Sequence, residues 1–473
     1  MDEKMILGCS CSVCGQNYTH TQADTTFVCP KDGGNLNFIY NYAELRSSIQ
    51  RSGFGKGGMW RYLPLLPIPK NSPIPPLIAG DTPLQHISVS ATHQLFGQDG
   101  AVIDLFIKDE GKNPTGSLKD RASALVVSKA LSEKKEIITT ASTGNAAAAL
   151  SGMCASVNLP CIIFVPSSAP PAKIAQLQTF GARVFLVKGD YDQAFDLCME
   201  CSNKFGWYNR STGYNPYTSE GKKTVSYEIC EQLASYIIAR TQPGSINACP
   251  IFSEPSHSSQ ITVHQLAGAN FASPDWIVVS VGDGNIISGV WSGLKDLFAL
   301  GIISALPHIL AVQAEGSNYI KQALDNDGGP LEWHKHPPIH SSTVADSISA
   351  DQPKDRVRAC IAIRDSGGSC ITVSDEEILN EIPNLGKATG IFAEPAASCA
   401  VAGLRKALHQ RIITSIKEEE PSTVALIITG SGLKDIASAQ RAINSNKDLI
   451  NSSTFTVDIS VEQVESFIIN QKH

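Results

Sequence analysis

ITTASTGNAAAALSG, residues 138–152, joins a short apolar strand pattern to an alanine-rich helix pattern through a polar glycine loop. The strand pattern ends at Ala141 and the helix pattern opens at Asn145. A strand that runs directly into a helix is the repeating unit of parallel sheets that are covered by helices on both faces. The segment therefore predicts an α/β fold.

The same alternation extends outward from this segment and begins at Asp81. Short apolar runs typical of buried strands are followed by longer runs with helical periodicity. The pattern predicts two three-layer domains with mainly parallel sheets, preceded by a small cysteine-containing N-terminal unit. We expect strands over 101–108, 136–141, 161–166, 184–187, 276–281, 309–313 and 423–429. We expect helices over 120–131, 145–157, 172–180, 190–205, 220–238, 286–300 and 395–409.

The composition argues against several classes of protein. The 473 residues carry a formal net charge of −7, which is unlike a general binder of nucleic acids or membrane surfaces. No apolar run reaches the roughly 18 residues that a membrane span needs. The acidic start MDEKMILGCS lacks the basic region of a signal peptide, and the 13 scattered cysteines suit reduced thiols. We expect a cytoplasmic protein with no nucleic-acid or membrane partner.

The segment KDEGKNPTGSLKDRASALVVSKA, residues 108–130, contains a candidate reactive lysine. Asn113–Gly116 has turn chemistry, and Ser117 should cap the helix that follows. Lys119 then lies in the first helical turn, where the helix dipole disfavours a cation and lowers its pKa. A lowered pKa suits a nucleophilic or Schiff-base lysine. The alternative is a solvated lysine in a Lys-Asp-Arg charge cluster, which is the more common case for a single lysine.

Two loops at strand ends are candidate anion sites. The loop 142–145 opens a helix, so its free N–H groups can hold a carboxylate, although an ordinary N-cap fits equally well. The loop 282–285, Gly-Asp-Gly-Asn, follows another predicted strand and can form a backbone nest for a phosphate. It does not match the G-x-G-x-x-G dinucleotide pattern.

Two hydroxyl side chains, Thr429 and Ser431, follow the last predicted strand. Open α/β sheets bind ligands at this carboxyl edge, although both residues could also be simple turn residues. One lysine, one carboxylate loop, one phosphate nest and one terminal hydroxyl are together what pyridoxal phosphate needs to act on an amino acid.

Six segments that contain these residues resemble the threonine synthases, a family of fold type II pyridoxal-phosphate enzymes. The resemblance covers roughly residues 80–445, and the segments occur in the family's order. They are NPTGSLKDR (113–121), ASTGN (141–145), VGDGNIISG (281–289), TVADSISADQPKDRVRACIAIRDSGGSCITVSDEEI (343–378), AEPAASCAVAG (393–403) and ITGSGLKD (428–435).

The resemblance implies a lyase that converts O-phosphohomoserine and water to threonine and phosphate. It implies that Lys119 binds the cofactor as a Schiff base and then acts as the catalytic base, and that Thr429, with Ser431 as the second choice, contacts the ring nitrogen. The implied cofactor contacts are Lys119, Asn145, Gly282, Asp283, Gly284, Asn285, Thr429 and Ser431. The implied substrate contacts are Ser142, Thr143, Gly144, Asn215, Thr218 and Lys222.

Two positions depart from the family: Leu118 stands where the family usually has phenylalanine, and Thr218 is the second. Threonine synthases often carry an arginine that clamps the substrate's distal phosphate at the position of Thr218, and threonine is a poor replacement for a guanidinium. Lys222, Lys223 and Lys112 are candidates to replace it. Two alternatives stay open: replacement or elimination on another amino acid, such as O-phosphoserine in cysteate synthase or serine or threonine, and a non-catalytic ligand-binding relative. Retention of Lys119 argues against the second.

The N-terminal cysteines resemble a degenerate zinc ribbon. Cys11-Ser-Val-Cys14 and Cys29-Pro-Lys-Asp32 offer three thiolates and one carboxylate, a set that can bind zinc. The alternative is a ribbon that folds without metal.

The predicted organisation has five parts, and a homodimer is an expectation from the resemblance alone. The polar stretch 241–259 should be a surface insertion. The parts are a ribbon-like unit (1–45), an extended arm rich in proline and glycine (46–80), a large cofactor-binding domain (81–135 and 226–450), a small domain for the substrate carboxylate (136–225) and a C-terminal extension (451–473).

Overall fold

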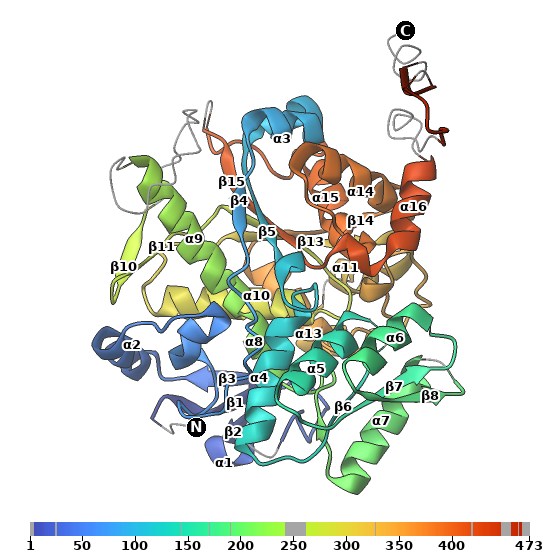
Figure 1. The fold of residues 1–473 in the computed structure, drawn as a ribbon. Helices are drawn as coiled ribbons and strands as arrows, with labels where there is room; N and C mark the ends of the chain where they lie inside the picture. The colour runs from blue at the N-terminus through green and yellow to red at the C-terminus, as the bar shows by residue number, and fades with distance from the viewer. Residues whose placement is uncertain are drawn as a thin grey trace.

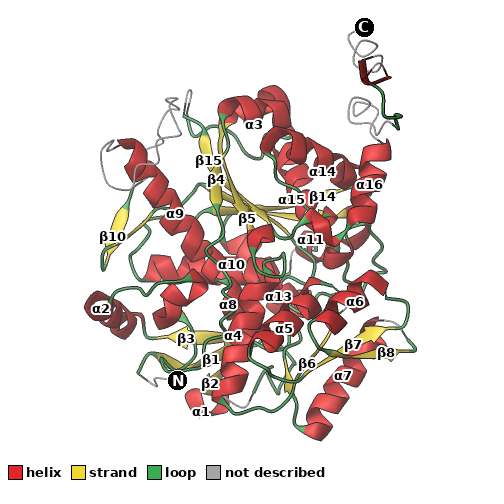
Figure 2. Cartoon of the chain, viewed as in Figure 1, coloured by secondary structure: helices red, strands yellow, loops and turns green. Residues whose placement is uncertain are grey.

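The computed structural model contains two parallel or mainly parallel sheets packed with helices, and a small N-terminal sheet (Figures 1 and 2). Most of the predicted insertion and much of the predicted C-terminal extension lie outside the described residues. The structure describes residues 4–23, 26–142, 144–169, 171–189, 191–241, 262–326, 328–417, 420–445, 456–461 and 463–465.

The larger sheet has six strands in the order β14-β13-β12-β15-β5-β4. Its neighbours pair in parallel, except that β4 pairs with β5 antiparallel at one edge. Both faces are buried, because Ile277 and Val279 of β12 join one apolar cluster and Val278 joins the other. The strands are β4 (Leu84–His86), β5 (Ile103–Asp109), β12 (Trp276–Ser280), β13 (His308–Ala314), β14 (Ser369–Val373) and β15 (Ser422–Ile428).

The smaller sheet has four parallel strands in the order β8-β7-β6-β9. Thr139 of β6 is in register with Asn209 of β9, so the residues that follow these two strands leave the sheet at the same edge. The strands are β6 (Ile138–Ala141), β7 (Cys161–Pro166), β8 (Arg183–Val187) and β9 (Tyr208–Asn209).

Helices cover both sheets, and α15 packs across β12 to β15 of the larger one. The predicted helix 220–238 is two helices, α8 and α9. The expected ranges include none for helices α1–α3, α11–α14 and α16, nor for strands β4, β9 and β14. The helices are α1 (His20–Ala23), α2 (Tyr42–Ser52), α3 (Val89–Phe96), α4 (Lys119–Ser132), α5 (Asn145–Ser156), α6 (Pro171–Thr179), α7 (Tyr191–Phe205), α8 (Tyr217–Lys222), α9 (Thr224–Thr241), α10 (Asn285–Ala299), α11 (Tyr319–Asp325), α12 (Pro330–Lys335), α13 (Arg356–Asp365), α14 (Asp375–Thr389), α15 (Pro395–His409) and α16 (Ile436–Ser445).

The mixed α/β class with mainly parallel sheets is confirmed. The other predicted strands and helices lie within a few residues of those observed. Within the described part of the chain, no helix is both long and apolar enough to cross a membrane.

The N-terminal residues form an antiparallel sheet in the order β2-β1-β3, with β1 (Ile6–Cys11), β2 (Asn17–Thr19) and β3 (Leu36–Tyr40). The prediction of an extended arm over 46–80 is wrong in part. Helix α2 reaches Ser52, and a 3-10 helix, η1, spans Gly58–Leu65. Proline is tolerated in such a short 3-10 turn, because few internal hydrogen bonds depend on its missing N–H. A two-stranded hairpin, β10 (His264–Leu266) and β11 (Ala269–Phe271), completes the sheets.

Candidate active site

Lys119 is the first residue of α4, as the sequence predicts. The predicted cap is wrong, because no side chain caps this helix and the Ser117 hydroxyl is buried with no hydrogen-bond partner among the described residues. Backbone pairing holds the start of the helix instead. The N–H of Leu118 donates to the carbonyl of Thr429 at 2.9 Å. The end of β15 therefore lies directly beside the lysine.

Ion pairs and hydrogen bonds fix the start of α4 from within the protein. Asp120 accepts hydrogen bonds from the N–H and hydroxyl of Thr115 at 2.8 and 2.7 Å. Arg121 is fully buried and forms ion pairs at 2.7 Å with Glu110 and with Glu228. The solvated charge cluster that was the alternative interpretation of this segment is thus excluded.

Burial of the Lys119 amine lowers its pKa to about 8. The negative charges of Glu394 and Asp283 act in the opposite direction, and the positive charge of Arg210 lowers the pKa further. The direction agrees with the sequence prediction, but the main cause is desolvation rather than the helix dipole. An amine with this pKa is partly neutral near neutral pH and can act as a nucleophile or base.

The glycine loop at the end of β12 has the geometry of an anion nest. Gly284 has φ 85°, and a Cβ there would lie 2.7 Å from the carbonyl oxygen of Asp355. Helix α10 begins at the next residue, Asn285, so free N–H groups face the loop. The Asp283 carboxylate is turned to the N–H of Lys354, which donates to it at 2.7 Å. Burial raises the pKa of Asp283 to about 6.

A buried lysine borders this loop. The ammonium of Lys222 donates to Oδ1 of Asn285, and Lys222 is fully buried. Burial, together with the positive charges of Lys119 and Arg210, holds the pKa of Lys222 well below its usual range. A bound anion would offset both the desolvation of the Lys222 ammonium and its repulsion by the neighbouring positive charges. The loop and Lys222 together therefore fit a phosphate.

Asn215 and Thr218, which were predicted to contact the substrate, make hydrogen bonds within their own turn. The Asn215 amide donates to the carbonyl of Asn209 and accepts from the N–H of Tyr217. The Thr218 hydroxyl donates to the carbonyl of Asn215 at 2.7 Å, and the side chain is fully buried. Both side chains are therefore engaged by their own turn.

Two of the lysines proposed to replace the missing arginine, Lys223 and Lys112, lie next to carboxylates. Lys223 forms ion pairs with Glu220 at 2.6 Å and with Asp296 at 2.9 Å, which balance its charge. Lys112 is exposed and lies 3.8 Å from Asp109. Neither lysine offers a buried, uncompensated positive charge.

Arg210 is a site residue that the sequence analysis missed. It follows β9 directly, is fully buried, and its N–H donates to the carbonyl of Thr139 in β6 at 2.8 Å. Its guanidinium donates to the hydroxyls of Ser123 and Thr212 at 3.3 and 2.5 Å. An arginine directly after a predicted strand would have been the signal, but a two-residue strand has no recognisable sequence pattern.

Glu394 is the second site residue that was missed. Asn145, the first residue of α5, donates through its amide to both oxygens of the Glu394 carboxylate, at 2.8 and 3.0 Å. Burial raises the pKa of Glu394, against the effects of Asn145 and Lys119. The Glu-Pro step that opens α15 was the available signal.

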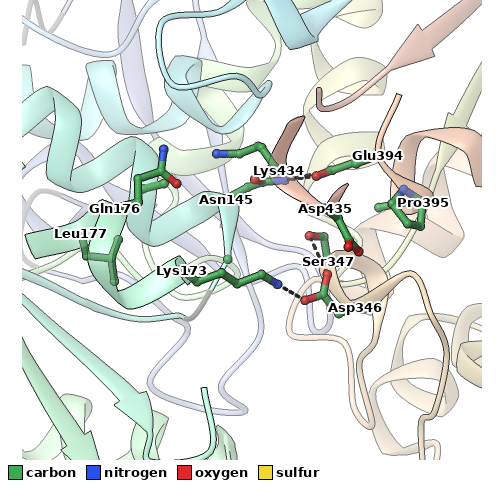
Figure 3. A pocket seen from close by; sticks show the side chains of 13 residues that line it. Asn145, Lys173, Gln176, Leu177, Asp346, Ser347, Glu394, Pro395, Lys434 and Asp435 are labelled. Atoms are coloured by element: carbon green, nitrogen blue, oxygen red, sulfur yellow. Dashed lines mark hydrogen bonds and ion pairs between the residues drawn. The ribbon is translucent and has the colours of Figure 1, made fainter. Parts of the chain in front are cut away.

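A pocket adjoins this pair at the boundary between the two sheets (Figure 3). One side includes Asn145 of α5 and Lys173 of α6, the helices that pack on the smaller sheet, and the other includes Glu394, Asp346 and Lys434. Lys173 forms an ion pair with Asp346 across the boundary.

The predicted carboxylate loop lies at the rim of the pocket. Gly144 lines the pocket. The N–H of Gly144 donates a hydrogen bond to the hydroxyl of Ser142 at 3.2 Å. Thr143 lies outside the described residues.

The terminal hydroxyls are used differently. Ser431 accepts a hydrogen bond from the N–H of Leu433 and so caps the 3-10 helix η6 (Gly432–Lys434). No hydrogen bond of the Thr429 hydroxyl is found in the described part of the chain, and Thr429 is buried beside the start of α4. Thr429 is therefore the better placed of the two for a ring nitrogen.

The residues fit pyridoxal phosphate. The glycine loop has no room for a side chain at Gly284, the buried amine of Lys222 borders it, and the amine of Lys119, whose pKa is lowered, lies within electrostatic reach of Lys222. These features match a phosphate, an aldehyde and an aromatic ring that are held at the carboxyl ends of parallel strands.

Comparisons with known proteins agree with this geometry. A family model described as "Pyridoxal-phosphate dependent enzyme" matches residues 76–248 and 258–430. The threonine synthase of Methanocaldococcus jannaschii is 32% identical over 91% of this chain and 94% of its own length. The threonine synthase of Methanosarcina acetivorans is 30% identical over 94% of this chain and 98% of its own length.

Solved structures share the fold. An L-serine ammonia-lyase from Rhizomucor miehei has a TM-score of 0.57 at 17% identity and covers 77% of this chain and 98% of its own. A processed threonine deaminase from Solanum lycopersicum has a TM-score of 0.56 at 18% identity, over 78% and 88% of the two chains. Such identities show the fold alone. The family match and the two relatives show more: this chain belongs to the pyridoxal-phosphate-dependent enzymes and is a lyase of the threonine synthase type.

Proposed function

We propose that the enzyme converts O-phosphohomoserine and water to threonine and inorganic phosphate. The observation that carries the proposal is the buried guanidinium of Arg210 at the carboxyl end of β9. β9 is in register with β6, and β6 leads directly into the carboxylate loop. An amino acid with a distal phosphate has one anion for each of these two neighbouring positions.

Arg210 takes over the role that the family's arginine has at the position of Thr218. A planar guanidinium can bind a phosphate through two parallel hydrogen bonds. Arg210 lowers the pKa of both Lys119 and Lys222, so its charge lies close to the reacting amine and to the phosphate loop. Its attachment to the smaller sheet, beside the carboxylate loop, supports a role on the substrate side of the site.

The proposed cofactor contacts divide by position. Gly282, Asp283, Gly284 and Asn285 would hold the phosphate through backbone N–H groups, with Lys222 neutralising its charge. Lys119 would bind the aldehyde carbon, and Asn145 would lie against the ring hydroxyl. Thr429 would donate to or accept from the ring nitrogen.

Pyridoxal phosphate, when bound, stabilises negative charge that develops on the substrate's α and β carbons. Lys119 is the group that holds and moves the protons, because its lowered pKa of about 8 leaves roughly a tenth of the amine neutral at pH 7, far more than for an ordinary lysine. Ser142 and Gly144 orient the substrate carboxylate at the start of α5. A neutral hydroxyl at Thr429, rather than a carboxylate, favours elimination and replacement over transamination.

A substrate screen tests the proposal. Purified holoenzyme is given O-phosphohomoserine, O-phosphoserine with sulfite, serine, or threonine, and both phosphate release and amino-acid products are measured. We expect equal amounts of phosphate and threonine from O-phosphohomoserine and little product from the others. Preferred turnover of O-phosphoserine, serine or threonine would contradict the proposed substrate but leave the lyase class intact.

The pH dependence of cofactor loading tests the role of Lys119 separately. Only a neutral amine adds to an aldehyde, so the loading rate of apoprotein should rise with pH and level off above the pKa of Lys119, about 8. Glu394→Gln should move the midpoint to lower pH, because the carboxylate raises this pKa. Arg210→Met should move it to higher pH. A midpoint near about 10.4, the value of an ordinary lysine, would contradict the burial of the amine.

A further inference from the structure

We propose that Cys11, Cys14, Cys29 and Asp32 bind one structural zinc ion in the N-terminal sheet. One ligand atom from each residue can be chosen so that all four lie within 4.8 Å of one another. The residues come from two loops that are far apart in sequence and are brought together by β1 and β3. Such convergence of three thiols and a carboxylate is the donor set of a closed zinc site.

Two of the distances between ligand atoms are close to those of a tetrahedron around zinc. The sulfurs of Cys14 and Cys29 are 3.8 Å apart, and the sulfur of Cys11 is 3.3 Å from Oδ1 of Asp32. Zinc bonds of about 2.3 Å to sulfur and about 2.0 Å to oxygen give tetrahedral separations of roughly 3.8 and 3.5 Å. The second carboxylate oxygen, Oδ2 of Asp32, is buried and has no hydrogen-bond partner among the described residues.

The two ligand loops have the same backbone conformation. Each contains two ligands three residues apart, and each is followed by a glycine with positive φ, Gly15 at 71° and Gly33 at 72°. In the first loop the N–H of Gly15 donates to the carbonyl of Cys11, and in the second the N–H of Gly33 donates to that of Cys29. Asp32 therefore stands in the second loop where Cys14 stands in the first.

Hydrogen bonds are in place to stabilise the ligands in their anionic forms. The N–H of Val13 donates to the sulfur of Cys11 at 3.3 Å, and the Tyr18 hydroxyl lies 3.0 Å from the sulfur of Cys29. The N–H of Gly34 donates to the Asp32 carboxylate at 2.9 Å. Binding releases three thiol protons and leaves a site with a formal charge of −2, which donors of this kind offset.

The zinc unit is packed against the segment that carries Arg210. The amide of Asn35, next to the second ligand loop, donates to the carbonyl of Gly213 at 2.6 Å. The ring of Phe27 makes edge contacts with Tyr208 of β9 and with Tyr214. The metal therefore acts by ordering a unit that supports the substrate side of the active site, and it takes no part in the reaction.

Metal analysis of the full-length holoenzyme tests the proposal without an activity assay. Protein expressed with added zinc should contain one zinc per chain, and Cys14→Ser and Cys29→Ser should reduce this at least tenfold. Cys201→Ser is the matched control, because Cys198 and Cys201 have the same spacing on helix α7 and should not affect zinc content. Asp32→Cys should retain the zinc, whereas Asp32→Ala should weaken its binding.

Cobalt substitution of the unmutated protein covers the case in which a cysteine variant fails to fold. Bound Co²⁺ should give the visible bands of a tetrahedral site and a thiolate charge-transfer band. Absence of zinc, equal zinc in the Cys14→Ser/Cys29→Ser double variant, or iron in its place would overturn the proposal. Zinc affinity unchanged in Asp32→Ala would overturn the assignment of the fourth ligand.

Discussion

Lys119→Ala should remove the cofactor's absorbance band at about 410 nm and reduce turnover by at least a factor of about 10³. The band depends on the covalent link between the amine and the cofactor. The rate depends on the same amine as a base, because burial lowers the pKa of Lys119 to about 8 and leaves part of the amine neutral near neutral pH. Both losses therefore follow from one substitution.

The control is Lys135→Ala, which removes a partly exposed lysine just beyond α4, paired with Glu133, and should leave both band and rate unchanged. Borohydride reduction of the holoenzyme, followed by peptide mass analysis, should place the added mass on the peptide that contains Lys119. A mass increase on another lysine, or a full 410 nm band in Lys119→Ala, would contradict the assignment.

Lys119 and the phosphate loop were predictable because their function depends on local chain geometry. A lysine in a first helical turn and a glycine loop between a strand and a helix are both visible in a short stretch of sequence. The structure confirms that Lys119 lies in the first turn of α4 and that the loop 282–285 joins β12 to α10, with a positive φ at Gly284. Their roles toward the cofactor stay predictions.

Arg210 and Glu394 were not predictable in the same way, because each acts through contacts distant in sequence. Asn145 reaches the Glu394 carboxylate across 249 positions of the chain. Arg210 owes its burial to β9, a strand of two residues that pairs with β6. Lys222 was predicted for the substrate, but the approach of α10 pairs it with Asn285 instead.

The alternative interpretation of Lys119, a solvated charge cluster, is excluded by contacts that are also distant in sequence. Lysine, aspartate and arginine side by side in sequence suggest a solvated surface. The structure buries Arg121 against Glu110 and Glu228, which come from separate segments. The partners that neutralise a buried charge come from other parts of the fold, so the spacing of residues along the chain says little about them.

Arg210→Met should lower kcat/KM for O-phosphohomoserine by a factor of about 10 to 100, mainly through KM. A hydrogen bond to a charged group contributes about 1.5–3 kcal/mol, and the variant removes at least one such bond to the substrate phosphate. Arg210→Lys keeps the charge but loses the planar fork, so its loss should be smaller. Thr218→Ser is the matched control, because it keeps the hydroxyl that donates to Asn215 and should leave KM unchanged.

Inhibition by inorganic phosphate separates a substrate contact from a structural role. If Arg210 binds the distal phosphate, Arg210→Met should weaken competitive inhibition by phosphate by about the same factor as it raises KM. The affinity for pyridoxal phosphate should change little, because Lys222 and the loop 282–285 hold that phosphate. A large loss of cofactor affinity with unchanged phosphate inhibition would instead place Arg210 on the cofactor, and the substrate phosphate would need another partner. Arg210 is thus the position at which the proposed substrate and the architecture of the smaller sheet are tested together.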